Sequence, residues 1–288
     1  MTKHSHRPGA PPYTRPSRPQ HTQRRRPRIA RRPPPTAPPY PSLPRPAAPA
    51  APRRAPRPRP IYFYHVYRTG GRSFSRAVLS EFKDLDAVWG RCHGSLGEKV
   101  VEVEGWKIVS WCGAPPISDF FYSWSHVPVY NVKIPKGCFT ITILRDPVDR
   151  FVSRARDLRK HDQLGNPIPG VFRNLGILLR KGLLSAARAC LPGERLEQLY
   201  HFSPTGDIDE ALETVRKISY VFRMEEYEEG LRGLRKLLGL KLPHLHCTDG
   251  DIPGLVYHDI AAQLIPQVTG GLREIFAPEY ELLERLGL

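Results

Sequence analysis

The chain has 288 residues, which suffices for one large domain or two small ones. Residues 1–60 hold 19 of the 32 prolines and 15 of the 44 lysines and arginines, and they hold no aspartate or glutamate. Residues 61–288 carry 29 basic and 28 acidic side chains. The net charge of +16 therefore belongs almost wholly to residues 1–60 and excludes no class of protein for the rest of the chain.

Membrane and secreted classes do not fit the composition. No segment offers 18 consecutive apolar residues, so we expect no membrane span. No apolar segment follows the N-terminal basic residues, so we expect no secretory signal. The cysteines are odd in number and scattered, which favours a reducing compartment over a disulfide framework. We therefore expect a soluble, cytoplasmic protein.

Residues 1–60 form a Pro/Arg-rich stretch that cannot build a core, because proline removes backbone donors and like charges repel. We expect a disordered tail. An arginine-rich arm could bind an anionic partner, such as nucleic acid or lipid, through counterion release. The alternative is a solvated tail, or sequence upstream of the true start, and the lack of interleaved aromatic residues favours it.

The pattern changes at residue 61. Residues 61–66 (IYFYHV) predict a buried strand, residues 67–71 a loop, and residues 73–82 a helix with apolar side chains at helical spacing. Strands are also expected at 100–103 and 107–111, and the next segment, 117–124, predicts a helix.

Residues 139–144 (FTITIL) predict a second clear strand. Asp146 and Pro147 are typical of a helix cap and first turn, and the helix should run to about Lys160. Further helices are expected at 171–189, 207–217, 225–238 and 271–288, with a short strand at 219–222. Strands that alternate with helices predict one α/β domain over 61–288, with a mostly parallel central sheet flanked by helices.

The first strand, loop and helix suit a phosphate. Gly70 and Gly71 let backbone N–H groups approach an anion, and a helix N-terminus adds its own donors. Thr69 and Ser73 supply hydroxyl groups, and Arg68 supplies a fixed charge. The loop lacks the Walker A lysine and the Rossmann glycine spacing. The alternative is an ordinary strand-to-helix turn.

The second strand and helix suit another phosphate. Arg145 ends the strand, where ligands of open α/β sheets bind, and Ser153 follows about two helical turns later. Both side chains could therefore meet one anion. The alternative is that Arg145 and Asp146 only cap the helix. We expect a structural ion pair for Arg150.

Both segments resemble signatures of the PAPS-dependent sulfotransferases, in the carbohydrate 2-O-sulfotransferase-like branch. HVYRTGGRSF is similar to the family's 5′-phosphosulfate loop, and RDPVDRFVS to its 3′-phosphate segment. The resemblance implies a P-loop-like three-layer domain that binds PAPS as donor. It assigns the 5′-phosphosulfate to Arg68, Thr69, Gly70, Gly71, Arg72 and Ser73, and the 3′-phosphate to Arg145 and Ser153.

Three positions depart from the family pattern: Tyr67 replaces a proline, Arg68 the lysine, and Arg72 a threonine. An arginine holds phosphate but gives up a proton poorly, so the match supports binding better than turnover. The resemblance covers residues 61–288, densely at the two motifs and thinly after residue 160.

Transfer to a hydroxyl needs a base, and SHVPVYN resembles the His-x-Pro segment of the carbohydrate branch. His126 is therefore the candidate base, beside Arg68 as the second catalytic candidate; the alternative is an ordinary loop histidine. His65, which matches the family's signature histidine, is interpreted as packing. His93, Glu98 and Glu102 are weaker candidates.

The sequence thus predicts a sulfotransferase that moves a sulfuryl group from PAPS to a hydroxyl acceptor, with a carbohydrate or glycoconjugate as the expected acceptor. No metal is expected, because His244, His246 and Cys247 have no second ligand cluster. Two alternatives stay open: a P-loop kinase-like enzyme that binds ATP and Mg²⁺, and a non-catalytic nucleotide- or nucleic-acid-binding protein.

Overall fold

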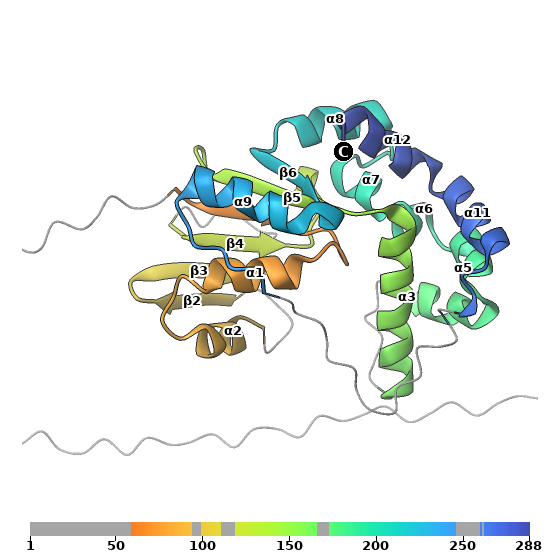
Figure 1. Cartoon of the computed structure of the whole chain (residues 1–288), viewed down its shortest axis with the longest axis horizontal. Helices are drawn as coiled ribbons and strands as arrows, with labels where there is room; N and C mark the ends of the chain where they lie inside the picture. Colours follow the sequence, from red (N-terminus) through yellow and green to blue (C-terminus); the bar gives the residue numbers. More distant parts are fainter. Residues whose placement is uncertain (1–58, 94–98, 111–118, 166–172, 246–259, 261) are drawn as a thin grey trace, which may run out of the picture. The chain divides into compact units, whose positions relative to one another are not determined.

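A computed structural model describes residues 59–93, 99–110, 119–165, 173–245, 260 and 262–288 (Figure 1). These residues belong to one compact unit, Arg54–Leu288. It is an α/β structure with a mostly parallel sheet, as the alternation of strands and helices predicted. The tail expected at 1–60 lies outside the described residues except for its last two.

Six strands form the sheet, in the order β2-β3-β4-β1-β5-β6. Every neighbouring pair is parallel except β2 and β3. The central β1 pairs with β4 on one side and with β5 on the other. The strands are β1 (Ile61–Tyr64), β2 (Lys99–Val103), β3 (Trp106–Ser110), β4 (Tyr122–Ser125), β5 (Phe139–Leu144) and β6 (Tyr220–Arg223).

The central strands are buried on both faces, because helices cover both sides of the sheet. All residues of β1, β4 and β5 are buried, and β1 divides its side chains between two cores. Tyr62 and Tyr64 face one core, while Ile61 and Phe63 face the other. A near-continuous apolar run is typical of parallel strands covered on both faces.

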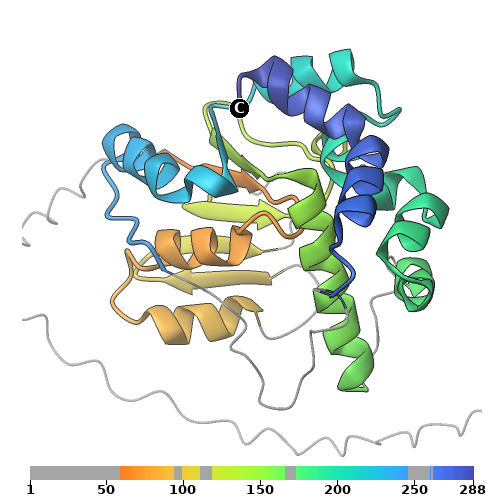
Figure 2. The same ribbon diagram turned by 45° about the vertical axis from the view of Figure 1, so that its right-hand side comes forward.

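One core packs the sheet against three helices, namely α1 (Gly71–Leu79), α2 (Leu85–His93) and α9 (Tyr227–Leu238). The helices of the second core are α3 (Pro147–Gln163), α4 (Arg173–Leu178), α5 (Leu183–Ala189), α7 (Glu197–Phe202), α8 (Ile208–Arg216), α11 (Pro266–Ile275) and α12 (Ala277–Leu286), with the short α6 (Pro192–Arg195) between α5 and α7. Figure 2 shows α11 beside α3, so distant parts of the sequence meet on this side. The helices that follow β1 and β5 thus lie on opposite faces.

The structure corrects one expected element. The helix predicted at 117–124 is wrong over its described part, because Tyr122–Ser125 forms β4 in the middle of the sheet. All four β4 residues are buried between the two helical layers. Periodicity alone does not separate a short buried strand from a buried helix.

Two expected helices are interrupted. The helix predicted at 171–189 is divided into α4, a 3₁₀ turn (Leu179–Lys181) and α5, because Gly182 has a left-handed φ of 97°. The helix predicted at 271–288 is divided into α11 and α12, which meet at Phe276 just before Pro278. Proline disfavours a continuing helix in the residue that precedes it.

The strand and the helix of the second predicted phosphate site form as the sequence predicted. Residues 139–144 are β5, and Asp146 caps α3 by accepting the backbone N–H of Asp149 at 2.9 Å, with Pro147 in the first turn. Within the described ranges, no helix is both long and apolar enough to cross a bilayer.

Candidate functional site

The candidate residues gather where the central parallel strands end. Arg145 directly follows β5, and His126 directly follows β4. Arg68 lies in the loop after β1, the strand between them. Since neighbouring parallel strands end at the same edge of a sheet, the topology brings all three to one edge.

The loop between β1 and α1 has an unusual backbone. Arg68 has a φ of 65° and Gly70 a φ of 85°, so both are left-handed. A left-handed residue other than glycine is uncommon, and such residues cluster at functional sites. Turns of this kind line up successive N–H groups for an anion. The backbone of the loop is thus compatible with the phosphate contact that the sequence predicts there.

The two glycines of this loop are required by close packing. A Cβ atom on Gly71 would lie 1.9 Å from Nε2 of His65, and one on Gly70 would lie 2.2 Å from Sδ of Met224. Real Cβ atoms do not come so close to other heavy atoms. The start of α1 thus sits directly against the His65 ring.

The Arg68 side chain extends from this loop to α3. Its Nε donates to Oγ of Ser153 at 3.1 Å, and its Nη1 lies 3.2 Å from a carboxylate oxygen of Asp157. Arg145 approaches from the other side and donates from Nη1 to the Arg68 carbonyl at 3.1 Å. Three residues that the sequence assigned to two phosphate contacts therefore meet directly.

The remaining loop residues differ in exposure. Thr69 is fully buried, and its hydroxyl donates to the Val66 carbonyl at 2.9 Å. Arg72 is exposed, and Ser73 is half-buried in the first turn of α1. The Thr69 side chain therefore supports the loop, while Arg72 is exposed in the first turn of α1.

Arg145 is a partly buried cation among carboxylates. Burial lowers the pKa of its guanidinium, and the nearby carboxylates of Asp149 and Glu225 oppose that shift. Glu225 also accepts the backbone N–H of Asp146 at 2.8 Å. The positive charge of Arg145 is thus held in a partly desolvated position, where its interaction with an anion is stronger than in water.

Beneath Arg145 lies a buried ionic network. Arg150 is fully buried and forms ion pairs with Glu197 at 3.0 Å and with Glu279 at 3.4 Å. Arg154 donates to both carboxylate oxygens of Glu197, at 3.2 and 3.0 Å. The structural ion pair expected for Arg150 is confirmed.

His126 is oriented by the loop after β1. Its Nδ1 lies 2.7 Å from the His65 carbonyl oxygen, which can only accept, so Nδ1 carries the proton. In the neutral ring the lone pair then belongs to Nε2. Tyr67 stacks on His126 with ring centroids 3.6 Å apart and planes 5° apart.

Tyr67 joins His126 to the ionic network. The guanidinium carbon of Arg154 lies 4.2 Å from the centroid of the Tyr67 ring, a cation–π contact. Burial raises the pKa of the Tyr67 hydroxyl to about 12, an effect that Arg154 opposes and Glu197 assists. Sequence reasoning noted Tyr67 only as a departure from the family pattern, and the structure makes it the support of the candidate base.

His65 lies one residue beyond β1 and is buried. Its ring stacks on Phe63 with centroids 5.0 Å apart and lies 4.1 Å from the His126 ring. The packing role predicted for this residue agrees with these contacts. Its backbone carbonyl has the additional role of orienting His126.

Sequence reasoning missed two carboxylates of the site. Asp157 lies four residues after Ser153, on the same face of α3, so helical spacing could have indicated it. Glu225 lies in the 3₁₀ turn Met224–Glu226 that follows β6, far from Arg145 in the sequence. No local pattern connects Glu225 to the site.

Among the weaker candidates, Glu102 does not join this site, because it is exposed on β2, the edge strand of the sheet. The His93 side chain and Glu98 lie outside the described residues. His244 pairs instead with Glu228, with 3.0 Å between Nδ1 and Oε2. The other members of that proposed cluster, His246 and Cys247, are not among the described residues. Across the described ranges, no group of three or more potential ligands could hold a metal ion.

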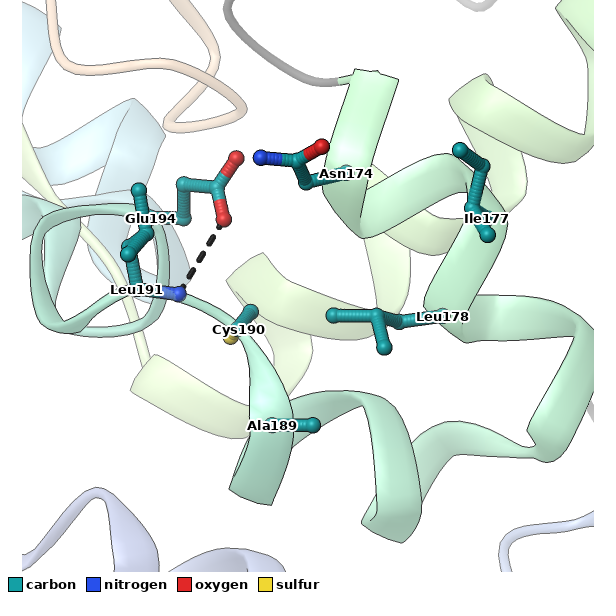
Figure 3. Close-up of a pocket in the computed structure, with 7 residues that line it drawn as sticks. All are labelled: Asn174, Ile177, Leu178, Ala189, Cys190, Leu191 and Glu194. Atoms are coloured by element: carbon teal, nitrogen blue, oxygen red, sulfur yellow. Dashed lines mark hydrogen bonds between the residues drawn. The ribbon is translucent and has the colours of Figure 1, made fainter. Parts of the chain in front are cut away.

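A pocket of about 260 Å³ lies elsewhere, between α4 and the segment that joins α5 to α6 (Figure 3). Its wall is mostly apolar, and the Glu194 carboxylate and the Asn174 amide lie at one end of it. None of the predicted site residues lines it. Its lining consists of Asn174, Ile177, Leu178, Ala189, Cys190, Leu191 and Glu194.

No family model and no curated protein matches the chain. The residues that meet where the parallel strands end are therefore what bears on function. Arg68, Arg145 and Ser153 meet there beside the N-terminus of α1, and the His126 ring is held by residues of the same β1–α1 segment.

Proposed function

We propose that residues 61–288 form a PAPS-dependent sulfotransferase domain of P-loop-like architecture. Its reaction is the transfer of a sulfuryl group to a hydroxyl acceptor, with a carbohydrate or glycoconjugate as the expected acceptor. One observation carries the proposal: at two neighbouring strand ends, Arg145 donates to the Arg68 carbonyl, and the Arg68 side chain donates to Ser153. A nucleotide with phosphates at both ends needs two such adjacent anion contacts.

The strand order supports a nucleotide at this edge. After β1 the chain forms β2, β3 and β4 on one side and then crosses to β5 on the other. The helices that follow β1 and β5 lie on opposite faces, so the chain diverges between these two strands. Ligands of open α/β sheets bind at such a switch point.

The donor contacts follow from the positions of the basic groups. Arg145 and Ser153 bind the 3′-phosphate, and the Arg68 guanidinium, already bonded to Ser153, adds charge between the two ends. The 5′-phosphosulfate lies against the backbone N–H groups of residues 70–73 at the α1 N-terminus, where the helix dipole favours an anion. Thr69 contributes through its backbone, because its hydroxyl is bonded to Val66.

His126 acts as the general base through Nε2. The His65 carbonyl holds the Nδ1–H tautomer, so Nε2 accepts the proton of the acceptor hydroxyl. The acceptor oxygen forms a bond to sulfur, the bond from sulfur to the bridging oxygen breaks, and its electron pair leaves with 3′,5′-ADP. Arg68 stabilises the charge on that oxygen electrostatically, without giving up a proton.

A titration of the full chain with 3′,5′-ADP and with ATP tests the nucleotide class. We expect calorimetry to show binding of 3′,5′-ADP and weaker binding of ATP, because only the former carries a 3′-phosphate. Arg232→Ala serves as a control, since Arg232 is an exposed arginine that pairs with Glu229 on α9, and it should leave both affinities unchanged. A preference for ATP, or no binding of either nucleotide, would overturn the proposal.

The His126→Ala variant tests the base. It should keep its affinity for 3′,5′-ADP and lose about 10²- to 10⁴-fold in the rate of PAPS turnover with a carbohydrate acceptor. His244→Ala is the control, because His244 is an exposed histidine that pairs with Glu228. Full turnover by His126→Ala would eliminate His126 as the base.

A further inference from the structure

The backbone of Arg145 is held by one side-chain amide. Gln198, in α7, is almost fully buried. Its Oε1 accepts the Arg145 N–H at 2.8 Å, and its Nε2 donates to the Arg145 carbonyl at 2.9 Å. A single amide therefore binds both main-chain groups of a single residue.

Gln198 is itself held by Glu279. The carboxylate of Glu279, fully buried in α12, accepts the Gln198 backbone N–H at 2.7 Å and the Nε2 group at 3.3 Å. All hydrogen-bonding groups of the Gln198 amide are thus occupied in a defined orientation. Arg150 balances the charge of Glu279 from α3.

The contact between Gln198 and Arg145 lies directly after the end of β5. Leu144 is the last residue of β5 and the last one paired with β6. Beyond it, Arg145 has no partner in the sheet ladder, and the Gln198 amide supplies the donor and the acceptor that a neighbouring strand would give. The direction in which Arg145 leaves the sheet is therefore fixed by Gln198.

We propose that Gln198, backed by Glu279, is the positioning residue of the 3′-phosphate site and sets the preference for a nucleotide that carries a 3′-phosphate. The inference rests on the proposed function, because Arg145 is taken as a 3′-phosphate ligand. Gln198 does not touch the nucleotide. It acts by holding the Arg145 backbone where the guanidinium reaches both the Arg68 loop and the phosphate.

The test compares 3′,5′-ADP with 5′-AMP, which lacks only the 3′-phosphate. In the full-length Gln198→Leu variant, we expect the affinity ratio of the two nucleotides to fall about tenfold or more, because a displaced Arg145 loses charged hydrogen bonds. The affinity for 5′-AMP should stay close to that of the wild type. A general loss of stability would lower both affinities together and leave the ratio unchanged.

Two variants serve as controls. Gln263→Leu removes a half-buried glutamine whose Oε1 likewise accepts a backbone N–H, that of Leu183 at 2.8 Å, and it should leave the ratio unchanged. Gln198→Asn keeps the amide but is one methylene shorter, so it should lower the ratio nearly as much as Gln198→Leu with less disturbance of the core.

Hydrogen exchange gives a readout that needs no nucleotide. The Arg145 amide should lose protection in Gln198→Leu, while the amide of Thr142, within β5, should keep it. If the wild type prefers 3′,5′-ADP but the variants keep the same ratio, the positioning role is overturned and the proposed function stands. If the wild type shows no preference for 3′,5′-ADP over 5′-AMP, the proposed function and the inference fall together.

Discussion

The β1–α1 and β5–α3 junctions lie on neighbouring strands, and different kinds of contact hold them. The first depends on backbone geometry, with left-handed residues at Arg68 and Gly70 and with Gly71 against a histidine ring. The second depends on side chains that arrive from other helices, among them Gln198 from α7 and Tyr280 from α12, whose hydroxyl donates to Asp146 at 2.8 Å.

The difference teaches which substitutions each junction tolerates. The first junction has no space for an added atom at its glycines, so it should be sensitive to gains in side-chain volume. The second is stabilised by buried polar partners, so it should be sensitive to their removal, because each loss leaves another buried group unsatisfied. The predictions below test this contrast.

The largest effect is expected for Arg150→Leu, which removes the central cation under the second junction. Two buried carboxylates, Glu197 and Glu279, would lose a partner. Breaking a buried pair on one side costs about 3–5 kcal/mol of unfolding free energy, measured by chemical denaturation. The exposed Arg232→Leu control should change it by less than about 0.5 kcal/mol. A small effect of Arg150→Leu would show that the network does not stabilise this junction.

Arg145→Ala should act on binding. Loss of the charged hydrogen bonds to a phosphate should weaken 3′,5′-ADP by about 1.5–3 kcal/mol, as calorimetry can measure. The affinity for 5′-AMP should change much less, because it lacks the phosphate that Arg145 binds. An unchanged affinity for 3′,5′-ADP would refute the assignment of Arg145.

Gly71→Ala tests the first junction. A Cβ atom there would lie 1.9 Å from the His65 ring, so the ring or the helix must move, and overpacking of this kind costs about 1–3 kcal/mol. Gly90→Ala in α2 is the matched control, because no heavy atom lies within 4 Å of its added Cβ, and it should not destabilise the protein. Equal stability of the two variants would contradict the close packing of this junction.

The smallest effect is expected for Asp157→Asn. The Asp157 carboxylate pairs with Arg68, and both side chains are about a quarter exposed, at 26% and 28%. Removal of this competing anion should strengthen 3′,5′-ADP binding by about 0.2–1 kcal/mol. A weaker affinity would mean that Asp157 positions Arg68 for the ligand and does not compete with it.

Local sequence patterns predicted the strand and the helix start that carry Arg145. The strand at 139–144 and the Asp146 cap follow from local patterns, while the resemblance implied that Arg68 and Arg145 serve one nucleotide. Gln198 lies 53 residues from Arg145, in a segment without a motif, and only the packing of α7 on β5 brings them together. Glu279 is still further away, in a helix that the sequence predicted but could not place in space.

The strand β4, which His126 directly follows, is a second example of a feature that local patterns did not predict. The pattern at 117–124 predicted a helix, so nothing in it indicated that His126 follows a strand. Its role was inferred from a resemblance alone. The stack with Tyr67 and the bond to the His65 carbonyl depend on the pairing of β4 with β1, which residue spacing does not reveal.

A crystal structure of the full chain with 3′,5′-ADP would test most directly whether the two strand ends hold one nucleotide. We predict the 3′-phosphate within hydrogen-bond distance of Arg145 and Ser153, and the 5′-phosphate against the backbone N–H groups of residues 70–73. A nucleotide bound elsewhere, or one whose phosphates touch neither junction, would contradict the proposed function.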